Sequence, residues 1–401
     1  MNPRDGPSMT IPETRLKLEL KKHHTLPEIE RMILSLSTTS EKYLDVWLAS
    51  DLGAQLFKDS LIVGLLGFAA KRGINTRVLD WIPAPSDSRL QERFGTTLEG
   101  LAALEYANEI VDSQKKDLYD RVYKHRLAVV EKDGIATPEK TGGQSLTFCA
   151  FDPTMPIPIG FSNIDTRASF VRTFLNIRRD FFEVGVNQRI PEPIDDAVAG
   201  FVYELWQNSL QHGRLNESHE VIKGMRYLRV RKHVGFDRNK FIERAEGFPE
   251  LQSYLDREII IPQKTGPYPD PKSFKFYEVT IADNGLGIVE RLLATRPEHR
   301  SHVVTEQDRS RFLNQIIDEA LSSKLTQTGA GHGLGNAIRA VRQLRGFLSV
   351  RSGSSWVFHS AGDDPRGGSQ AQLDDVKHSG PLASLGTHFS LIYPLRSPVT
   401  K

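Results

Sequence analysis

The segment Glu204-Leu-Trp-Gln-Asn208-Ser-Leu-Gln-His212-Gly213 combines a helical apolar face with two polar side chains that suit phosphate chemistry. Glu204 and Asn208 are four residues apart, so a helix places both on one face, one turn from each other. An amide oxygen there can ligate Mg²⁺ while the carboxylate takes a proton from a nucleophile. The alternative is a solvated glutamate beside a surface asparagine. Gly213 is a natural helix C-cap, and we favour helix termination over catalysis as the role of His212.

Three glycine-containing segments follow this helix in the chain. They are Asp283-Asn-Gly285-Leu-Gly287-Ile288, then Gly329-Ala-Gly331-His-Gly333-Leu-Gly335, then Leu385-Gly386-Thr387. The alternation from Tyr277 to Ile281 predicts a strand that delivers Asp283 to its end. Glycines that open a helix expose backbone N–H groups toward phosphate. The second segment lacks the Gly-Lys-Ser/Thr of a Walker A loop, and no strand immediately precedes it as a dinucleotide-binding fingerprint requires.

In their order and chemistry, the four segments resemble the N, G1, G2 and G3 boxes of the GHKL ATP-binding superfamily. That superfamily includes DNA gyrase, heat-shock chaperone ATPases, MutL, histidine kinases and anti-sigma-factor serine kinases. The likeness covers roughly half of the chain. It implies a histidine-kinase-like ATPase domain of the Bergerat type, with ATP and Mg²⁺ as ligands.

The resemblance also assigns a role to each segment. Asn208 would hold Mg²⁺ and contact the nucleotide, and Glu204 would activate water or a hydroxyl group. Asp283 would accept the adenine amino group and reject guanine, which presents an acceptor at that position. Thr387 would support the hydrogen bonds on the adenine side. The other residues expected to bind the nucleotide are Gly285, Gly287, Ile288, Lys324, Gly329, Gly331, His332, Gly333, Leu334 and Gly335.

The ATP-binding domain is expected over residues 156–401, after a proline-rich boundary, with an α/β (α+β) fold. The resemblance implies a mixed, mostly antiparallel sheet covered by helices on one face. About 70 residues separate Gly213 from Asp283, more than a compact domain needs. We therefore expect an insertion at about 232–272, and an ATP lid at about 288–328, where the family carries one.

The N-terminal half is predicted to form a separate α/β domain over residues 12–155, after a loose segment 1–11. Strands over 43–48 and 75–80, with a helix over 55–71 between them, imply a parallel pair joined by a crossover.

The Asp59-Ser60 pair at this helix resembles STAS-type domains, the anti-sigma antagonists that anti-sigma serine kinases phosphorylate. The resemblance implies that Ser60 is the phosphate acceptor. Leu61 and Ile62 replace a serine and a glycine of the family pattern, which counts against phosphorylation. The alternative is a generic small α/β domain in which Ser60 is an ordinary helical residue.

Composition narrows the class of protein further. A net charge of +2 gives no indication of nucleic-acid or membrane binding. The single cysteine, Cys149, lies in an apolar stretch and fits a buried structural thiol in a reducing cytoplasm. No apolar run reaches the length of about 20 residues that a membrane span needs, and the N-terminus lacks the apolar core of a signal peptide. We therefore expect a cytoplasmic protein.

Three functions are compatible with these residues. The first is a regulatory ATPase in which ATP binding and hydrolysis switch conformation or the binding of a protein partner or second copy. The second is a signalling kinase of the serine or histidine type that uses the same site. The third is a nucleotide-gated adaptor with little turnover.

Overall fold

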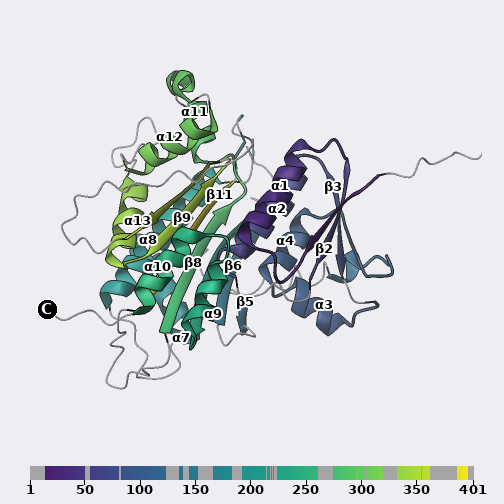
Figure 1. Cartoon of the computed structure of the whole chain (residues 1–401), viewed down its shortest axis with the longest axis horizontal. Coiled ribbons are helices and arrows are strands. Elements are labelled where there is room, and N and C mark those ends of the chain that lie inside the picture. Colours follow the sequence, from purple (N-terminus) through teal and green to yellow (C-terminus); the bar gives the residue numbers. More distant parts are fainter. Residues whose placement is uncertain are drawn as a thin grey trace, which may run out of the picture.

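A computed structural model of the chain describes most of its helices and strands. The residues described are 14–49, 55–80, 83–122, 135–138, 144–151, 166–182, 192–213, 215–216, 218, 220, 224–260, 274–295, 297–303, 305–318, 332–353, 355–361 and 386–395. They form two sheets with helices around them, so the general α/β class is confirmed (Figure 1).

The smaller sheet is parallel and lies in the N-terminal part of the chain, with strand order β1-β2-β3-β4. Its strands are β1 (Leu16–Leu20), β2 (Tyr43–Leu48), β3 (Asn75–Asp80) and β4 (Glu109–Val111). The connecting helices are α1 (Leu26–Thr38), α2 (Lys58–Lys71), α3 (Asp87–Phe94) and α4 (Leu98–Tyr106). The strands predicted over 43–48 and 75–80 and their parallel pairing are confirmed. The helix expected from residue 55 begins at Lys58, after Phe57 takes a left-handed conformation with φ 62°.

The larger sheet has strand order β10-β9-β11-β8-β7-β6-β5, and every described pair in it is antiparallel. Its strands are β5 (Ile135–Pro138), β6 (Gln144–Phe151), β7 (Met225–Gly235), β8 (Phe274–Asp283), β9 (Phe347–Ser352), β10 (Ser355–Ser360) and β11 (Thr387–Pro394). β5 and β6 lie before residue 155, yet β6 pairs with β7 along its length. The sheet therefore includes residues 135–138 and 144–151, which the sequence assigned to the N-terminal domain.

One face of the larger sheet packs against helices that come after β6 in the chain. These are α7 (Arg167–Phe182), α8 (Glu192–His212), α11 (Ile288–Thr295), α12 (Glu306–Asp318) and α13 (His332–Gln343). Their apolar residues share a core with alternate residues of the strands, such as Val279, Ile281 and Leu391. The 3₁₀ segment Pro297–His302 joins α11 to α12. Within the expected lid, α11 and α12 are the helices that the structure describes.

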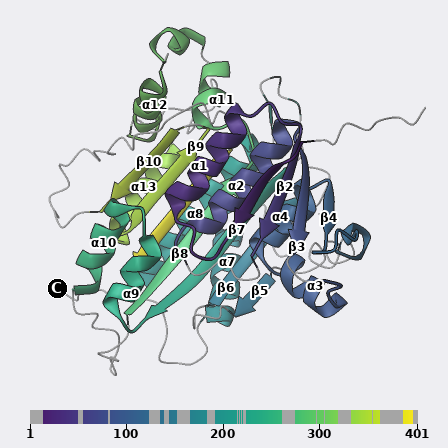
Figure 2. The ribbon, with the colours of Figure 1, turned by 45° about the vertical axis from the view of Figure 1, so that its right-hand side comes forward.

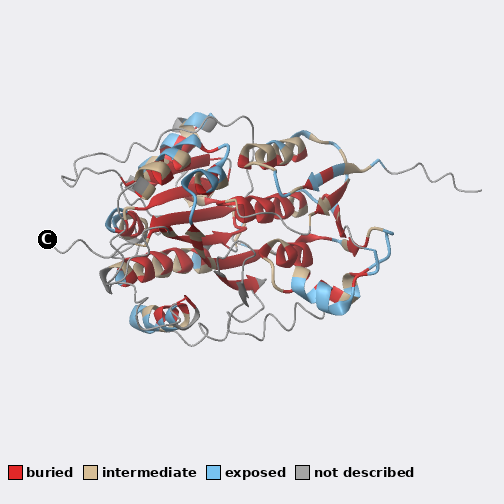
Figure 3. Cartoon of the chain, turned by 60° about the horizontal axis from the view of Figure 1, so that its bottom comes forward, coloured by how far each residue is buried: buried red, intermediate tan, exposed pale blue. Residues whose placement is uncertain are grey.

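The opposite face of the sheet is also covered, which corrects the expectation of helices on one face only. α1 and α2 of the N-terminal unit lie against it, together with two helices of the predicted insertion, α9 (Arg238–Ile242) and α10 (Pro249–Ile260) (Figure 2). A single apolar core joins residues of both units, among them Ile62, Phe248 and Phe276. Buried residues run from the larger sheet into α2 in Figure 3. The remaining 3₁₀ turn of the insertion is Glu243–Ala245.

Charged side chains anchor the N-terminal unit to this second face. Asp59 at the start of α2 forms ion pairs with Arg229 and Arg231 of β7, and all three are mostly buried. Glu278 of β8 accepts a hydrogen bond from the Phe57 backbone N–H at 3.2 Å. Burial alone would raise the pKa of Asp59, but the two guanidinium groups outweigh it and hold that pKa below its ordinary value. Asp59 is therefore an ionised part of the junction between the two units.

Two further observations bear on the class of protein. Cys149 is buried in the shared core, as expected, and burial raises the pKa of its thiol to about 12. Within the described residues, none of the helices combines the length and the apolar character needed to cross a membrane.

Candidate functional site

The turn after β8 holds Asp283 at the edge of the core between the sheet and its C-terminal helices. Side chains alternate along a strand, and Tyr277, Val279 and Ile281 of β8 all enter that core. Asp283 has the same parity, so its carboxylate belongs to the same face. It is 9% exposed, and its Oδ1 accepts a hydrogen bond from the Gly285 N–H at 2.9 Å. Thr387 pairs with Asp283 across β11 and β8, which places both predicted adenine-side residues together.

Glycines let three backbone segments converge on Asp283. A Cβ atom on Gly213, at the end of α8, would lie 2.4 Å from the Cβ and Cγ of Asp283. A Cβ on Gly285 would lie 2.8 Å from the Cα of Gly213, and one on Gly386 would lie 2.1 Å from the Asp283 carbonyl oxygen. Real Cβ atoms do not approach so closely, so side chains at these positions would force the segments apart. The segments 204–213, 283–288 and 385–387 of the sequence therefore meet at Asp283.

Burial controls the charge of the Asp283 carboxyl. Removal from water raises its pKa to about 6, because the ionised form loses solvation. The Gly285 N–H, Lys71 of α2, the Thr387 N–H and Arg226 all favour the ionised form and limit this rise. The group is a buried acceptor that is mostly ionised at neutral pH.

The second half of the same turn is held by β9. Gly287 has φ 99°, a conformation that favours glycine. The next residue, Ile288, donates its backbone N–H to the Ser352 Oγ at 2.6 Å. Glu290 in the first turn of α11 forms an ion pair with Arg309 of α12. The turn is therefore fixed on both sides of Gly287, and Ser352 is a supporting residue that the sequence motifs did not identify.

α8 presents the two residues predicted to act on phosphate. Glu204 and Asn208 are both half-buried. Arg167, in the first turn of α7, lies with its Nη1 3.9 Å from the Glu204 Oε1 and its guanidinium 5.8 Å from the Tyr203 ring centroid. The Arg167 side chain is 55% exposed, so this ion pair is open to water. A cation beside Glu204 was not anticipated, because α7 is a separate element of the sequence.

α13 begins at His332, inside the segment 329–335, and packs against α8. Leu334 and Gly335 are half-buried in its first turn. The predicted residues Lys324, Gly329 and Gly331 lie outside the described residues. The backbone of His332 and Gly333 opens the helix, but the side chains of His212 and His332 are likewise outside the description.

The donor set around α8 fits a hard cation that also binds phosphate. Asn208 offers an amide oxygen and Glu204 a carboxylate, both ligand types that Mg²⁺ accepts. Of the side chains described, no group of three or more His, Cys, Asp or Glu residues is arranged to hold a metal ion.

Comparisons of the chain with protein-family models, with curated proteins and with solved structures find no match.

Proposed function

We propose that this protein is an Mg²⁺-ATP-binding regulatory ATPase, in which the state of the nucleotide changes conformation or partner binding. The convergence of Gly213, Gly285 and Thr387 on Asp283 carries the proposal. It brings three of the four sequence segments to one buried carboxylate that can accept a hydrogen bond from an adenine amino group. α13, which opens at the remaining segment, packs beside α8 and its polar residues.

In this proposal the chain supplies recognition and proton transfer. Asp283 and Thr387 read the base, and the backbone N–H groups that open α13 face the phosphates. Glu204 takes a proton from water as the water oxygen bonds to the γ-phosphorus and the bond to the β–γ bridging oxygen breaks. Asn208 would hold Mg²⁺, and the bound ion would offset the charge of the phosphates.

A nucleotide-gated adaptor with little turnover is the second candidate, and Arg167 favours it. A guanidinium 3.9 Å from Glu204 competes with a nucleophilic water for the carboxylate. A kinase that phosphorylates its own Ser60 has less support. Ser60 is 4% exposed at the junction of the two units, and its hydroxyl donates to the Phe57 carbonyl oxygen at 2.7 Å.

The test measures ATP binding and turnover separately on the purified chain with Mg²⁺ and γ-labelled ATP. The variants are Glu204→Gln, Asp283→Asn, and Glu250→Gln, which changes an exposed glutamate of α10 as a control. We expect free phosphate from wild type and the control, bound ATP without turnover in Glu204→Gln, and loss of binding in Asp283→Asn.

Other outcomes select among the alternatives. Label on the protein itself would indicate a kinase. ATP binding without turnover in wild type would favour the adaptor. If wild type fails to bind ATP, the proposal is wrong.

A further inference from the structure

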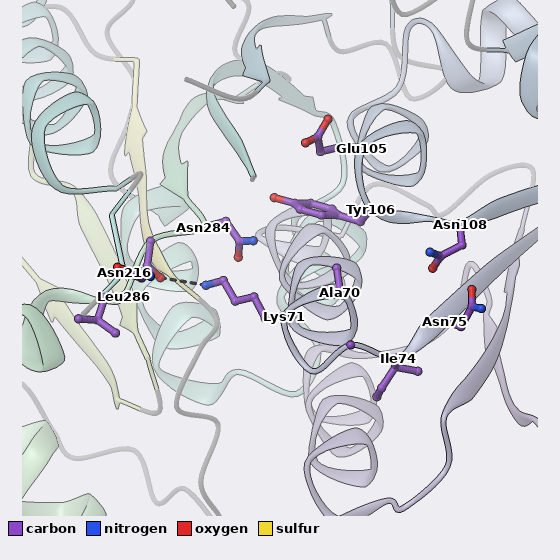
Figure 4. Close-up of a pocket in the computed structure, with 12 residues that line it drawn as sticks. Ala70, Lys71, Ile74, Asn75, Glu105, Tyr106, Asn108, Asn216, Asn284 and Leu286 are labelled. Atoms are coloured by element: carbon purple, nitrogen blue, oxygen red, sulfur yellow. Dashed lines mark hydrogen bonds between the residues drawn. The ribbon is translucent and has the colours of Figure 1, made fainter. Parts of the chain in front are cut away.

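A cavity of about 640 Å³ lies between the N-terminal unit and the turn that follows Asp283 (Figure 4). Its walls come from the C-terminal ends of α2 and α4, the start of β3, and residues 284–286. Four carboxamides line it, from Asn75, Asn108, Asn216 and Asn284. This volume is within the range of about 300–1,000 Å³ typical of small-molecule sites.

Asn284 is the buried polar group of this cavity. It follows Asp283 directly, yet its side chain points the other way, toward the elements that carry Tyr106 and Ala70 (Figure 4). Glycines make room for it, because a Cβ on Gly67 of α2 would lie 2.9 Å from its Oδ1 and one on Gly224 would lie 3.0 Å from its Cβ. Asn284 is 6% exposed, and its Nδ2 has no hydrogen-bond partner among the described residues. A buried donor without a partner is costly, so a ligand acceptor there would stabilise it.

We propose that this cavity is a second ligand site, which takes an uncharged polar heterocycle of nucleobase or nucleoside size. The Asn108 Oδ1 accepts a hydrogen bond from the Thr76 N–H, and Asn216 is bonded to Ser218 and Glu220. Asn75 and Asn284 are the carboxamides that offer a donor and an acceptor side by side, the pattern that suits the edge of a base. Lys71 and Glu105 bring one positive and one negative charge to the lining. That balance favours a neutral ligand over a polyphosphate, which would need several cations or a cluster of N–H donors.

The cavity is joined to the candidate ATP site through one residue. Gly285 donates its N–H to the Asp283 carboxylate at 2.9 Å, and its carbonyl oxygen accepts a hydrogen bond from the Lys71 Nζ at 2.9 Å. An occupant that moves Lys71 therefore acts on the residue that orients Asp283. This coupling rests on the proposed ATP-binding function, and by linkage each ligand must change the affinity of the other by the same factor.

The first experiment measures nucleoside binding to the full chain without ATP, by calorimetry with guanosine, cytidine and uridine. Adenosine is excluded because Asp283 could bind it. The variants are Ala70→Trp, which fills the cavity, Asn284→Ala, and Asn239→Ala, an exposed asparagine of α9 as a control. We expect at least one nucleoside to bind wild type and Asn239→Ala equally, about tenfold more weakly to Asn284→Ala, and not to Ala70→Trp. Absence of binding to wild type overturns the proposal, as does equal binding to folded Ala70→Trp and Asn284→Ala.

The second experiment tests the coupling with the nucleoside identified in the first. ATP affinity is measured with and without it, in wild type and in Lys71→Met, which removes the hydrogen bond to Gly285. We expect the nucleoside to change the affinity for ATP in wild type and to change it by a smaller factor in Lys71→Met. Independent binding of the two ligands in wild type would overturn the coupling. Failure of ATP to bind at all would instead refute the proposed function and leave the cavity result standing.

Discussion

Replacing Asp59 by alanine is expected to weaken the junction between the two units more than an ordinary loss of an ion pair. Asp59 contacts Arg229 and Arg231, whose side chains are 12% and 6% exposed. Arg231 keeps Glu278 at 3.7 Å after the change. The two mostly buried guanidinium groups lose the carboxylate that they share, and loss of one partner of a buried ion pair costs about 3–5 kcal/mol, so we expect the free energy of unfolding to fall by about that amount.

The exposed pair between Asp87 and Arg121 supplies a matched control. Its side chains are 76% and 39% exposed, and Asp87→Ala is expected to cost about 0–1 kcal/mol. Urea unfolding of both variants, followed by circular dichroism, measures the difference. Water screens the pair of Asp87 and Arg121 but not the buried contacts of Asp59. Similar losses of unfolding free energy in the two variants would therefore refute the inference that buried charge anchors the N-terminal unit.

The pH dependence of stability tests the contribution of Asp59 to the junction independently. The pKa of Asp59 in the folded chain lies below its ordinary value of 3.8, since Arg231 and Arg229 outweigh the effect of burial. A carboxylate with a lowered pKa contributes stability that is complete above the unfolded pKa and is lost as pH falls through the folded one. The part of the gap between wild type and Asp59→Ala that comes from Asp59 itself should therefore be constant near neutral pH and should narrow only below about pH 4. Glu99, whose pKa is raised by burial and by the Asp59 charge, accounts for any change of the gap at higher pH. A gap that narrowed between pH 6 and 8 would point to another group.

Three further predictions concern the turn after β8. Gly213→Ala should abolish ATP binding, because its Cβ would lie 2.4 Å from Asp283, whereas Gly200→Ala within α8, whose Cβ would lie 3.3 Å from the flexible end of Arg167, should leave calorimetric binding intact. ATP binding should weaken as pH falls below about 6, the pKa to which burial raises the Asp283 carboxyl, and affinities measured across pH 5–8 would show a flat profile if that carboxylate is not the acceptor. Alanine in place of glycine usually stabilises a helix by about 1 kcal/mol. Gly67→Ala should instead lower the thermal unfolding temperature, because its Cβ would lie 2.9 Å from the Asn284 Oδ1. A stabilised variant would contradict this close approach.

Local sequence patterns anticipated the elements that carry the candidate site. The alternation before Asp283 predicted β8, the spacing of Glu204 and Asn208 predicted α8, and both elements are confirmed. These patterns are readable because the periods of strands and helices are set by the local backbone. Thr387 pairs with Asp283 across β11 and β8, so the two residues are neighbours. The assigned roles of these residues stay predictions.

The interface between the two units could not be predicted in the same way. The sequence indicated that Asp59 and Ser60 belong to the start of a helix, but not that Asp59 meets Arg229 some 170 positions later. It also offered no reason to connect Lys71 with Gly285, or Arg167 with Glu204. Such contacts depend on how separate elements pack, and the local patterns of a single sequence do not indicate which distant elements come together.

The amino-acid sequence by itself determined the periodic elements, the glycines that permit close approach, and the order of the four segments. Tertiary structure alone decided that residues 135–138 and 144–151 join the larger sheet and that the N-terminal unit covers its second face. It also brought α2, α4 and β3 of the N-terminal unit together with Asn284 around one cavity. The reason is physical: periodicity and turn chemistry act between neighbours in the chain, whereas burial, charge pairing and cavities arise only where distant segments exclude water together.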